Sequence, residues 1–253
     1  MKQRRRRLIP RIGVVVTVLL FAGLTWASIA SRSSAPTAAP VERDLTAELA
    51  LAAAVQGEVS LDRNFYVVFD GSGSMLDAGC AGRFPDRLEA AKWAVTEFAT
   101  QSVPANVSLG LYAFDARGAG PRVPLNKDNR EMMRQQIAQI RGGGATPLDT
   151  AITAGVTELA TQRARQLGYG DFYLVVATDG EASDVAEARN AVQFAHKHAI
   201  PIITIGFCLD RDHALAGGSI SYRSADNPQA LLAALQQTQG ESPYFDNSVF
   251  QKR

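Results

Sequence analysis

Two stretches of this chain are apolar at almost every position, which restricts the folds that it can adopt. The first runs from Phe65 to Phe69 and is followed by Asp70; the second runs from Phe172 to Ala177 and is followed within two residues by Asp179. A strand that faces solvent on one side alternates apolar and polar residues, whereas a strand covered on both faces does not. The sequence therefore predicts a sheet with helices packed on both of its faces.

Strand and helix patterns alternate along most of the chain. Strands are predicted at 64–70, 107–114, 172–178, 201–208 and 219–223, with an additional edge strand near Val123. Amphipathic helices are predicted between them, at 86–99, 128–140, 146–160, 184–198 and 227–237. Such alternation is typical of an α/β fold, so we expect a doubly wound, mainly parallel sheet with helices on both faces.

Two of these helices carry recognisable start signals. Asp86 and Glu89 have the spacing of a capping box, in which the first side chain accepts a hydrogen bond from the third backbone N–H of the helix. Thr146 is followed by Pro147, a residue favoured at the first helical position, so we expect Thr146 to be the N-cap of its helix.

The N-terminal region indicates export. Residues 1–11 contain six basic residues and no acid, and residues 12–30 contain no charge. Nineteen helical residues reach roughly 28 Å, about the thickness of the hydrocarbon core of a bilayer. The segment is therefore either a single-pass anchor in the inner, cytoplasmic membrane or a cleaved signal peptide, and both place the domain on the periplasmic or extracellular side. We expect a linker and helical stalk at 31–61, a globular domain at 62–240 and a tail at 241–253.

The net charge of the chain bears on which classes of partner it can bind. The net charge is +1, and without the basic N-terminus the chain is slightly acidic, so a nucleic-acid partner is not expected.

The chain has two cysteines, Cys80 and Cys208. An oxidising compartment would allow them to form a disulfide, but the sequence alone leaves open whether they are bonded or are two thiols.

Oxygen-bearing side chains follow the two buried strands. "DGSGSM" supplies Asp70, Ser72 and Ser74, and "ATDG" supplies Asp179. "GGGATPL" places Thr146 at the end of a glycine-rich loop. In an open parallel sheet, ligands bind at the carboxyl ends of the strands, where strand order reverses. If the strands at 64–70 and 172–178 are neighbours across that reversal, these five side chains converge.

The donor set indicates a hard cation. Two carboxylates at close range repel unless a cation lies between them. Oxygen ligands without sulfur or imidazole suit Mg²⁺, with Ca²⁺ or Mn²⁺ as alternatives. Because three of the five donors are neutral, the ion keeps positive charge, and an open coordination position could accept a carboxylate from a protein partner. A small-molecule substrate is not expected.

The three motifs "DGSGS", "GGATPL" and "ATDG", in this order, resemble the metal-ion-dependent adhesion site of von Willebrand factor type A domains. The resemblance covers roughly residues 64–239 and fills all five ligand positions. It implies a Rossmann-like fold with one antiparallel edge strand, Mg²⁺ at the carboxyl edge of the sheet and recognition of an acidic residue on a protein partner. Ser72 and Ser74 would be direct ligands, whereas Thr146 and Asp179 would alternate between direct and water-mediated coordination.

The same resemblance bears on the origin of the protein and on its cysteines. The absence of integrin-type insertions and the tail "SADNPQALLAALQQT" make the chain look like the bacterial members, which often work beside ATPases of the AAA+ class or on cell-envelope assemblies. The first association would require a cytoplasmic domain, which the charge asymmetry of the N-terminus argues against. The family's strand order would separate the strands next to Cys80 and Cys208 by one strand, about 10 Å in total. The long loop after the first strand could bridge that gap.

Three further residues are expected at the rim of the site. Asp77 and Glu181 would add negative potential around the metal, and His213 lies in a loop that should project from the same edge. The main alternative is a Mg²⁺-dependent hydrolase or phosphatase-like enzyme that uses the same acids. The chain lacks the second aspartate, the phosphate-binding lysine and the nucleophile elbow of the corresponding enzyme motifs, so a non-enzymatic binding module is favoured.

Overall fold

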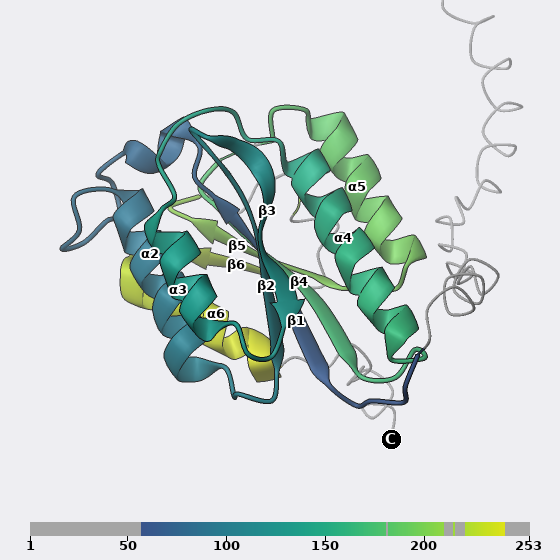
Figure 1. Ribbon diagram of the computed structural model, residues 1–253. Helices are drawn as coiled ribbons and strands as arrows, with labels where there is room; N and C mark the ends of the chain where they lie inside the picture. The colour runs from purple at the N-terminus through teal and green to yellow at the C-terminus, as the bar shows by residue number, and fades with distance from the viewer. Residues whose placement is uncertain (1–56, 181, 210–214, 216–220, 241–253) are drawn as a thin grey trace, which may run out of the picture. The chain divides into compact units, whose positions relative to one another are not determined.

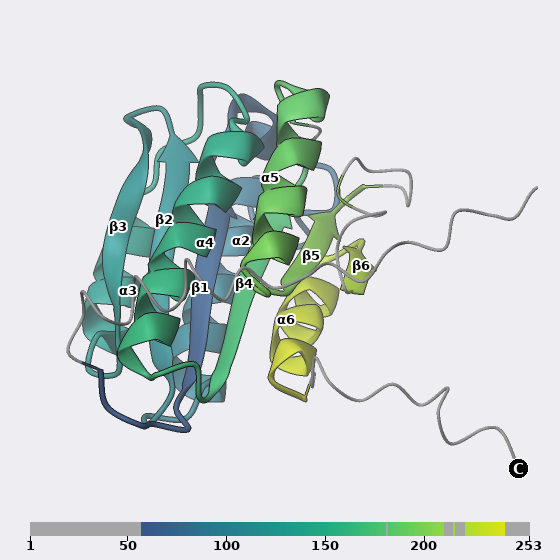
Figure 2. The same cartoon turned by 90° about the vertical axis from the view of Figure 1, so that its right-hand side faces the viewer.

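The computed structural model describes residues 57–180, 182–209, 215 and 221–240 of the chain. Within these residues a six-stranded sheet has the order β3-β2-β1-β4-β5-β6, which can be followed from left to right in Figure 2. The strands are β1 (Arg63–Asp70), β2 (Ser108–Asp115), β3 (Gly118–Asn126), β4 (Asp171–Thr178), β5 (Ile202–Phe207) and β6 (Ser221–Ala225). Neighbouring strands are parallel except β2 and β3, which are antiparallel. The predicted fold class is confirmed.

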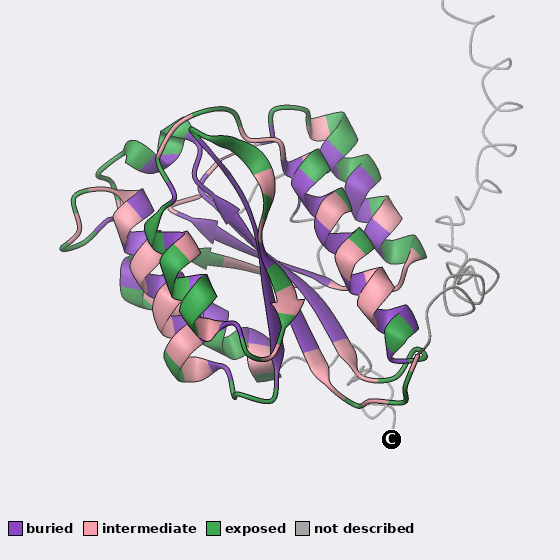
Figure 3. Ribbon diagram, in the orientation of Figure 1, coloured by how far each residue is buried: buried purple, intermediate pink, exposed green. Residues whose placement is uncertain are grey.

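Helices cover both faces of the sheet, as the two apolar runs predict. Figure 1 shows α2 (Arg87–Glu97), α3 (Arg130–Ala138) and α6 (Pro228–Gln237) on one face, and α4 (Leu148–Arg165) and α5 (Val185–Lys197) on the other. The central strands between these layers are buried (Figure 3).

Side chains of β1 divide between the two hydrophobic cores. Phe65, Val67 and Phe69 pack in the core under α2, α3 and α6, while Tyr66 and Val68 pack in the core under α4 and α5. Successive residues of a strand point to opposite faces, so a run of large apolar residues supplies both cores at once. The run therefore anchors β1 between the two cores and positions Asp70 at the carboxyl end of a central strand.

Most helix starts agree with the sequence. Asp86 caps α2, because its Oδ1 accepts a 2.8 Å hydrogen bond from Glu89 N. Asp184 caps α5 in the same way, and Asn227 caps α6 with Pro228 at the first helical position. These caps satisfy N–H groups that would otherwise lack a partner.

The expected N-cap at Thr146 is wrong. The helix α4 begins at Leu148, with Pro147 at the cap position and no side-chain cap. Thr146 is instead held by the loop after β4: its N–H donates to Ser183 Oγ (3.0 Å), and its carbonyl accepts from Ser183 N (3.0 Å). These bonds between loops keep Thr146 outside the helix.

Other element boundaries also differ from the prediction. The edge strand near Val123 is the nine-residue β3, which pairs with β2 from Gly118 to Asn126 and forms a hairpin with it. The last strand, β6, extends to Ala225, two residues beyond the predicted end at 223, and its predicted first residues, 219 and 220, lie outside the described part of the chain. The predicted membrane segment at 12–30, the tail at 241–253 and most of the stalk also lie outside it. In the described part, no helix has the length and apolar character needed to cross a bilayer.

The direction of winding reverses between β1 and β4. These strands are direct neighbours, but the chain leaves β1 through α2 toward β2 and leaves β4 through α5 toward β5. Because α2 and α5 lie on opposite faces, the loops that follow β1 and β4 diverge (Figure 1). The reversal assumed in the sequence analysis is therefore present.

Candidate metal centre

The two buried acids lie at this reversal. Phe69 pairs with Ala177, so Asp70 is level with Thr178, and Asp179 follows one residue later. Both acids are buried, with Asp70 fully inaccessible and Asp179 only 4% exposed. Strand register alone thus brings together the two carboxylates that are far apart in the sequence.

A chain of hydrogen bonds links the loop after β1 to Asp179. Ser72 N donates to Asp70 Oδ1 at 2.8 Å, which turns the chain back over the end of its own strand. The hydroxyl oxygens of Ser72 and Ser74 lie 3.0 Å apart, and Ser74 Oγ donates to Asp179 Oδ1 at 2.7 Å. Four of the five predicted donors therefore form one connected cluster.

Thr146 approaches the same cluster from the loop before α4. A side chain added at Gly180 would place its Cβ 3.4 Å from Ser74 Oγ and 3.9 Å from Thr146 Oγ1, so both hydroxyls lie beside Gly180. The glycine in "ATDG" keeps this space free of a side chain. In the described part of the chain, Thr146 Oγ1 makes no hydrogen bond, so it can contribute its lone pairs to a ligand.

Thr178 is a site residue that sequence reasoning missed. Its Oγ1 donates a 2.5 Å hydrogen bond to Asp70 Oδ2 and receives one from Gly180 N at 3.2 Å. Burial raises the pKa of Asp70, hydrogen bonds from Ser72 and Thr178 counteract the shift, and the charge of Asp179 raises the pKa further. Thr178 thus orients a carboxylate that burial makes difficult to keep ionised. In the sequence, the position of Thr178 directly before Asp179 was the one indication that it belongs to the site.

The donors fit a hard divalent cation. In the described part of the chain, no three His, Cys, Asp or Glu side chains gather as a metal-binding group. The cluster instead combines two carboxylates with the hydroxyls of Ser72, Ser74 and Thr146 around the side-chain-free Gly180. Such all-oxygen sets suit Mg²⁺, Mn²⁺ or Ca²⁺.

Arg87 is the second residue that the sequence did not reveal. From the first position of α2, its Nη1 lies 3.0 Å from Asp179 Oδ2, its Nη2 lies 3.1 Å from Asp77 Oδ1, and its Nε donates to Gly79 O at 2.9 Å. Asp77, predicted at the rim, is exposed and helps to hold Arg87. The other two predicted rim residues, Glu181 and His213, lie outside the described residues.

The ion pair between Arg87 and Asp179 leads to a prediction about the stability of the protein. Arg87→Gln should lower the unfolding free energy of the metal-free protein by about 1–3 kcal/mol, because a buried carboxylate would lose its charged partner. Urea unfolding in EDTA measures the loss. Arg134→Gln is the matched control, since Arg134 pairs with Glu131 at the exposed surface of α3 and its loss should leave stability unchanged. Equal losses in both variants would contradict the buried role of Arg87.

Cys80 and Cys208 form a disulfide in the structure, with their Cα atoms 5.8 Å apart. Cys80 lies in the loop between β1 and α2, and Cys208 directly follows β5. Since β5 is separated from β1 only by β4, the bond spans the strand order that the resemblance implied. The disulfide ties the loop that contains Asp77 and Gly79 to the carboxyl edge of the sheet.

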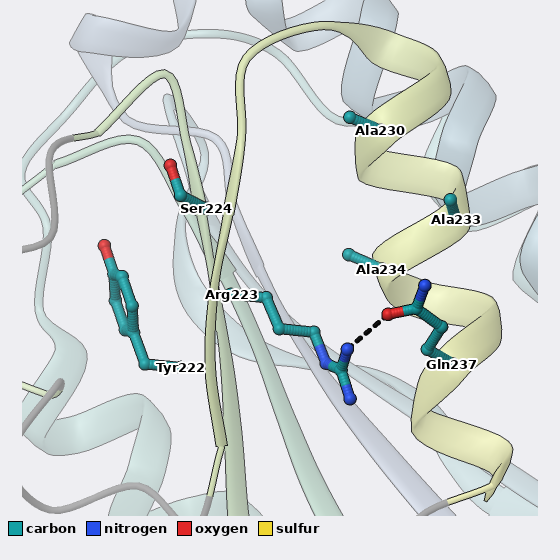
Figure 4. A pocket seen from close by; sticks show the side chains of 7 residues that line it. All are labelled: Tyr222, Arg223, Ser224, Ala230, Ala233, Ala234 and Gln237. Atoms are coloured by element: carbon teal, nitrogen blue, oxygen red, sulfur yellow. Dashed lines mark hydrogen bonds between the residues drawn. The ribbon is translucent and has the colours of Figure 1, made fainter.

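The described pockets lie elsewhere. One of about 580 Å³ lies between β6 and α6 and is lined by Tyr222, Arg223, Ser224, Ala230, Ala233, Ala234 and Gln237. Figure 4 shows Arg223 donating to Gln237 across it. A second pocket lies between α4 and α5 and is lined by Asp149, Thr150, Thr153, Ala154, Glu187, Asn190, Ala191 and Phe194. Neither pocket contains any of the five oxygen donors.

Solved structures share this fold at low sequence identity. The structure is similar to the vWF domain of the type V pili tip protein Mfa5 from Porphyromonas gingivalis, with a TM-score of 0.59 and 16% identity, over 75% of this chain and 99% of that one. It is also similar to the pilus adhesin SpaC from Lactobacillus rhamnosus GG, with a TM-score of 0.58 and 16% identity, over 73% of this chain and 31% of that one.

A third similar structure is proximal thread matrix protein 1 from the mussel byssus, with a zinc-occupied MIDAS motif. Its TM-score is 0.55 and its identity 18%, over 71% of this chain and 47% of that one. No curated protein matches the chain. A family model, described as the von Willebrand factor type A domain, matches residues 64–252, about three quarters of the sequence. The chain therefore belongs to the von Willebrand factor type A domain family.

Proposed function

We propose that this protein is a metal-dependent recognition module that binds Mg²⁺ through Asp70, Ser72, Ser74, Thr146 and Asp179 and captures a carboxylate of a protein partner. The observation that carries the proposal is the hydrogen-bonded cluster at the ends of β1 and β4, in which two buried acids meet the hydroxyls of Ser72 and Ser74, with Thr146 Oγ1 close by. Ca²⁺ and Mn²⁺ are the alternative ions, because they accept the same oxygen donors.

The donor residues differ in how far they are exposed to solvent. Asp70, Asp179 and Ser72 are buried, whereas Ser74 is exposed and Thr146 is half-buried. The negative charge therefore lies at the base of the site together with Ser72, and the hydroxyl-bearing residues Ser74 and Thr146 lie toward solvent. A bound dication would supply a positive centre with an exchangeable position on that outer side. The two carboxylates would neutralise the dication only in part, because Arg87 already pairs with Asp179.

The comparisons support adhesion as the class of function. Two of the similar structures are a pilus tip domain and a pilus adhesin, and a third contains a metal in its MIDAS motif. These names describe those proteins. For this chain they favour a binding role, with the partner presenting an aspartate, a glutamate or a chain terminus.

The proposed location is the outer side of the cytoplasmic membrane of a bacterium. The basic residues 1–11 would stay inside, and the apolar segment 12–30 would anchor the chain or be cleaved during export. The disulfide between Cys80 and Cys208 supports this location, because such bonds persist in oxidising compartments.

Catalysis has less support than binding. A hydrolase that used histidine as its general base would need that histidine near the acids, and His196 and His198 lie at the C-terminal end of α5. This helix begins near the metal edge at Val185, and its 13 residues extend about 20 Å away from it. Turnover of phosphate-ester or peptide substrates that needs Mg²⁺ and is lost in Asp179→Asn would favour the hydrolase alternative.

Metal binding and partner capture test the proposal together. Calorimetric titration of the full-length protein should show one Mg²⁺ site, and Asp179→Asn should weaken it at least about 100-fold, because loss even of a group that only orients a ligand costs about 10–100-fold. Asp171→Asn is the control, since Asp171 lies at the opposite end of β4.

Crosslinking in cells should then trap a partner with the wild type and the control but not with Asp179→Asn. The same partner trapped equally by all three proteins, with and without EDTA, would refute recognition through a metal.

A further inference from the structure

Three arginines surround a buried aspartate beside the proposed metal site. Asp115, the last residue of β2, has a fully buried side chain whose Oδ1 accepts hydrogen bonds from Arg117 N (2.9 Å) and Arg122 Nη2 (3.1 Å). Its Oδ2 accepts from Arg117 Nε and Arg141 N, both at 3.1 Å. We call Arg117, Arg122 and Arg141 the arginine corner.

The arginine corner has more positive charge than its contacts neutralise. Burial alone would raise the pKa of Asp115, but hydrogen bonds from Arg141 and Arg117 lower it, so its single negative charge persists. No described acid other than Asp115 forms an ion pair with any of the three arginines. The side chain of Arg141 is exposed and makes no polar contact with a described residue. Arg122 Nε is buried and lacks a hydrogen-bond partner there.

The backbone holds this corner directly against the loop with the metal donors. Gly71 N donates to Phe114 O at 2.8 Å, and Gly143 N donates to Gly71 O at 2.9 Å. Ala116 N donates to Arg141 O at 2.9 Å, which completes the link between the three loops. Backbone hydrogen bonds therefore tie the corner to the loop with the donors that follow β1.

An exposed apolar side chain lies near both features. Leu76, two residues after Ser74, is 53% exposed. It lies on Gly142, where an added Cβ would come within 2.3 Å of Leu76 Cδ2, and Gly142 follows Arg141 directly. The surface next to the metal donors thus combines an apolar contact with excess positive charge.

We propose that the arginine corner is a second binding site for the same protein partner, which receives a second carboxylate from the segment whose first carboxylate binds the metal. The proposal rests on the proposed function. The metal donors lie between the ends of β1 and β4, about one and a half strand spacings of ~4.8 Å, or roughly 7 Å, from the end of β2. An extended chain rises about 3.3 Å per residue, so the two acids should be separated by about two positions, or by three with the added reach of an arginine side chain.

An acidic peptide fits this surface better than a nucleic acid does. Polyanion binding needs an extended basic surface, whereas the three arginines here form a small cluster whose backbone is linked to Gly71, next to the buried acid Asp70. A short segment with two acids can match the metal and the arginines together. Charges at the edge of an interface contribute mainly to selectivity and to the rate of association.

Fluorescence anisotropy with synthetic alanine-based peptides tests the proposal on the full-length protein in Mg²⁺. One labelled peptide has a single aspartate, and others have two aspartates separated by two or three positions. We expect the two-acid peptides to bind roughly twofold to fivefold more tightly at low salt. Arg141→Gln combined with Arg117→Gln should remove this gain and leave single-acid binding unchanged. Arg141→Gln alone should remove part of it, and this variant loses no described contact.

The possible results distinguish a failure of the arginine-corner proposal from a failure of the metal-site proposal. Arg134→Gln, on α3, should retain the full gain and serves as the charge-matched control. If single-acid binding needs Mg²⁺ but the two-acid peptides gain nothing, the arginine-corner proposal is wrong and the metal proposal stands. If Mg²⁺ changes the binding of none of the peptides, the proposed metal-dependent function is wrong, and the arginine-corner proposal, which rests on it, is wrong too. A 12-nucleotide single strand that competes better than the two-acid peptides, through the same arginines, would replace the acidic segment with a nucleic acid.

Discussion

Asp70→Asn is expected to abolish Mg²⁺ binding and, at the same time, to raise the stability of the metal-free protein. The carboxylate of Asp70 is fully buried, burial raises its pKa, and the nearby charge of Asp179 raises it further. An ionised group in such a place costs free energy that only a bound cation would offset. Replacing it by a neutral amide removes both the cost and the metal ligand.

The local hydrogen bonds allow this substitution without a new defect. The amide oxygen can still accept from Ser72 N. Thr178 Oγ1 lies 3.1 Å from Gly180 O, so its hydroxyl can donate there and accept from the new amide group. We therefore expect a gain of about 0.5–2 kcal/mol, in the range of changes that relax a site strained for function.

The gain should depend on pH in a defined direction. Because the folded-state pKa of Asp70 lies above its ordinary value of 3.8, protonation of Asp70 stabilises the folded wild type. This contribution is complete below that value and is lost as the pH rises through the folded-state pKa. The difference between variant and wild type should thus be small in acid and largest at neutral pH.

Urea unfolding in EDTA at several pH values, together with titration by Mg²⁺, measures both effects. Asp171→Asn, at the other end of the sheet, should show neither the gain nor the loss of metal binding. A less stable Asp70→Asn variant at neutral pH, or one that still binds Mg²⁺ with the wild-type affinity, would show that Asp70 is not a strained ligand.

Residues at the ends of strands were predictable because strand geometry determines where they lie. Asp70 and Asp179 each follow a run of buried residues, and parallel neighbours bring their carboxyl ends to one edge. The same reasoning placed Ser72 and Ser74, which lie within four residues of Asp70. Their position needed only local turn chemistry and the strand order.

Residues whose role depends on contacts between loops were not predictable. Thr146 has the pattern of an N-cap, but hydrogen bonds to Ser183 keep it outside the helix. Arg87 reaches Asp179 only because α2 begins beside the end of β4. In the sequence, Thr178 is a polar residue at the end of a strand, and nothing there shows that it donates to Asp70. These contacts join segments that only the folded chain brings together.

The disulfide is expected to contribute more to stability than any other single interaction in the described domain. It joins residues 128 positions apart, and the entropy of closing such a loop in the unfolded chain corresponds to about 5 kcal/mol. Both cysteines have left-handed backbone conformations, with φ of 61° and 60°, which cost about 1 kcal/mol or more each in the folded state. Cys80→Ser with Cys208→Ser should therefore lower the unfolding free energy by about 3–5 kcal/mol.

Reducing agent separates this effect from the chemistry of the new side chains. Dithiothreitol should destabilise the wild type to the level of the double variant and should leave the variant unchanged, as measured by urea unfolding. Because the hydrogen bonds between Asp70, Ser72 and Ser74 are local, Mg²⁺ affinity should change less than about threefold while the protein remains folded. If the folded double variant bound Mg²⁺ more than tenfold more weakly, the disulfide would be positioning the loop for the metal as well as stabilising the fold, through Asp77 and Arg87.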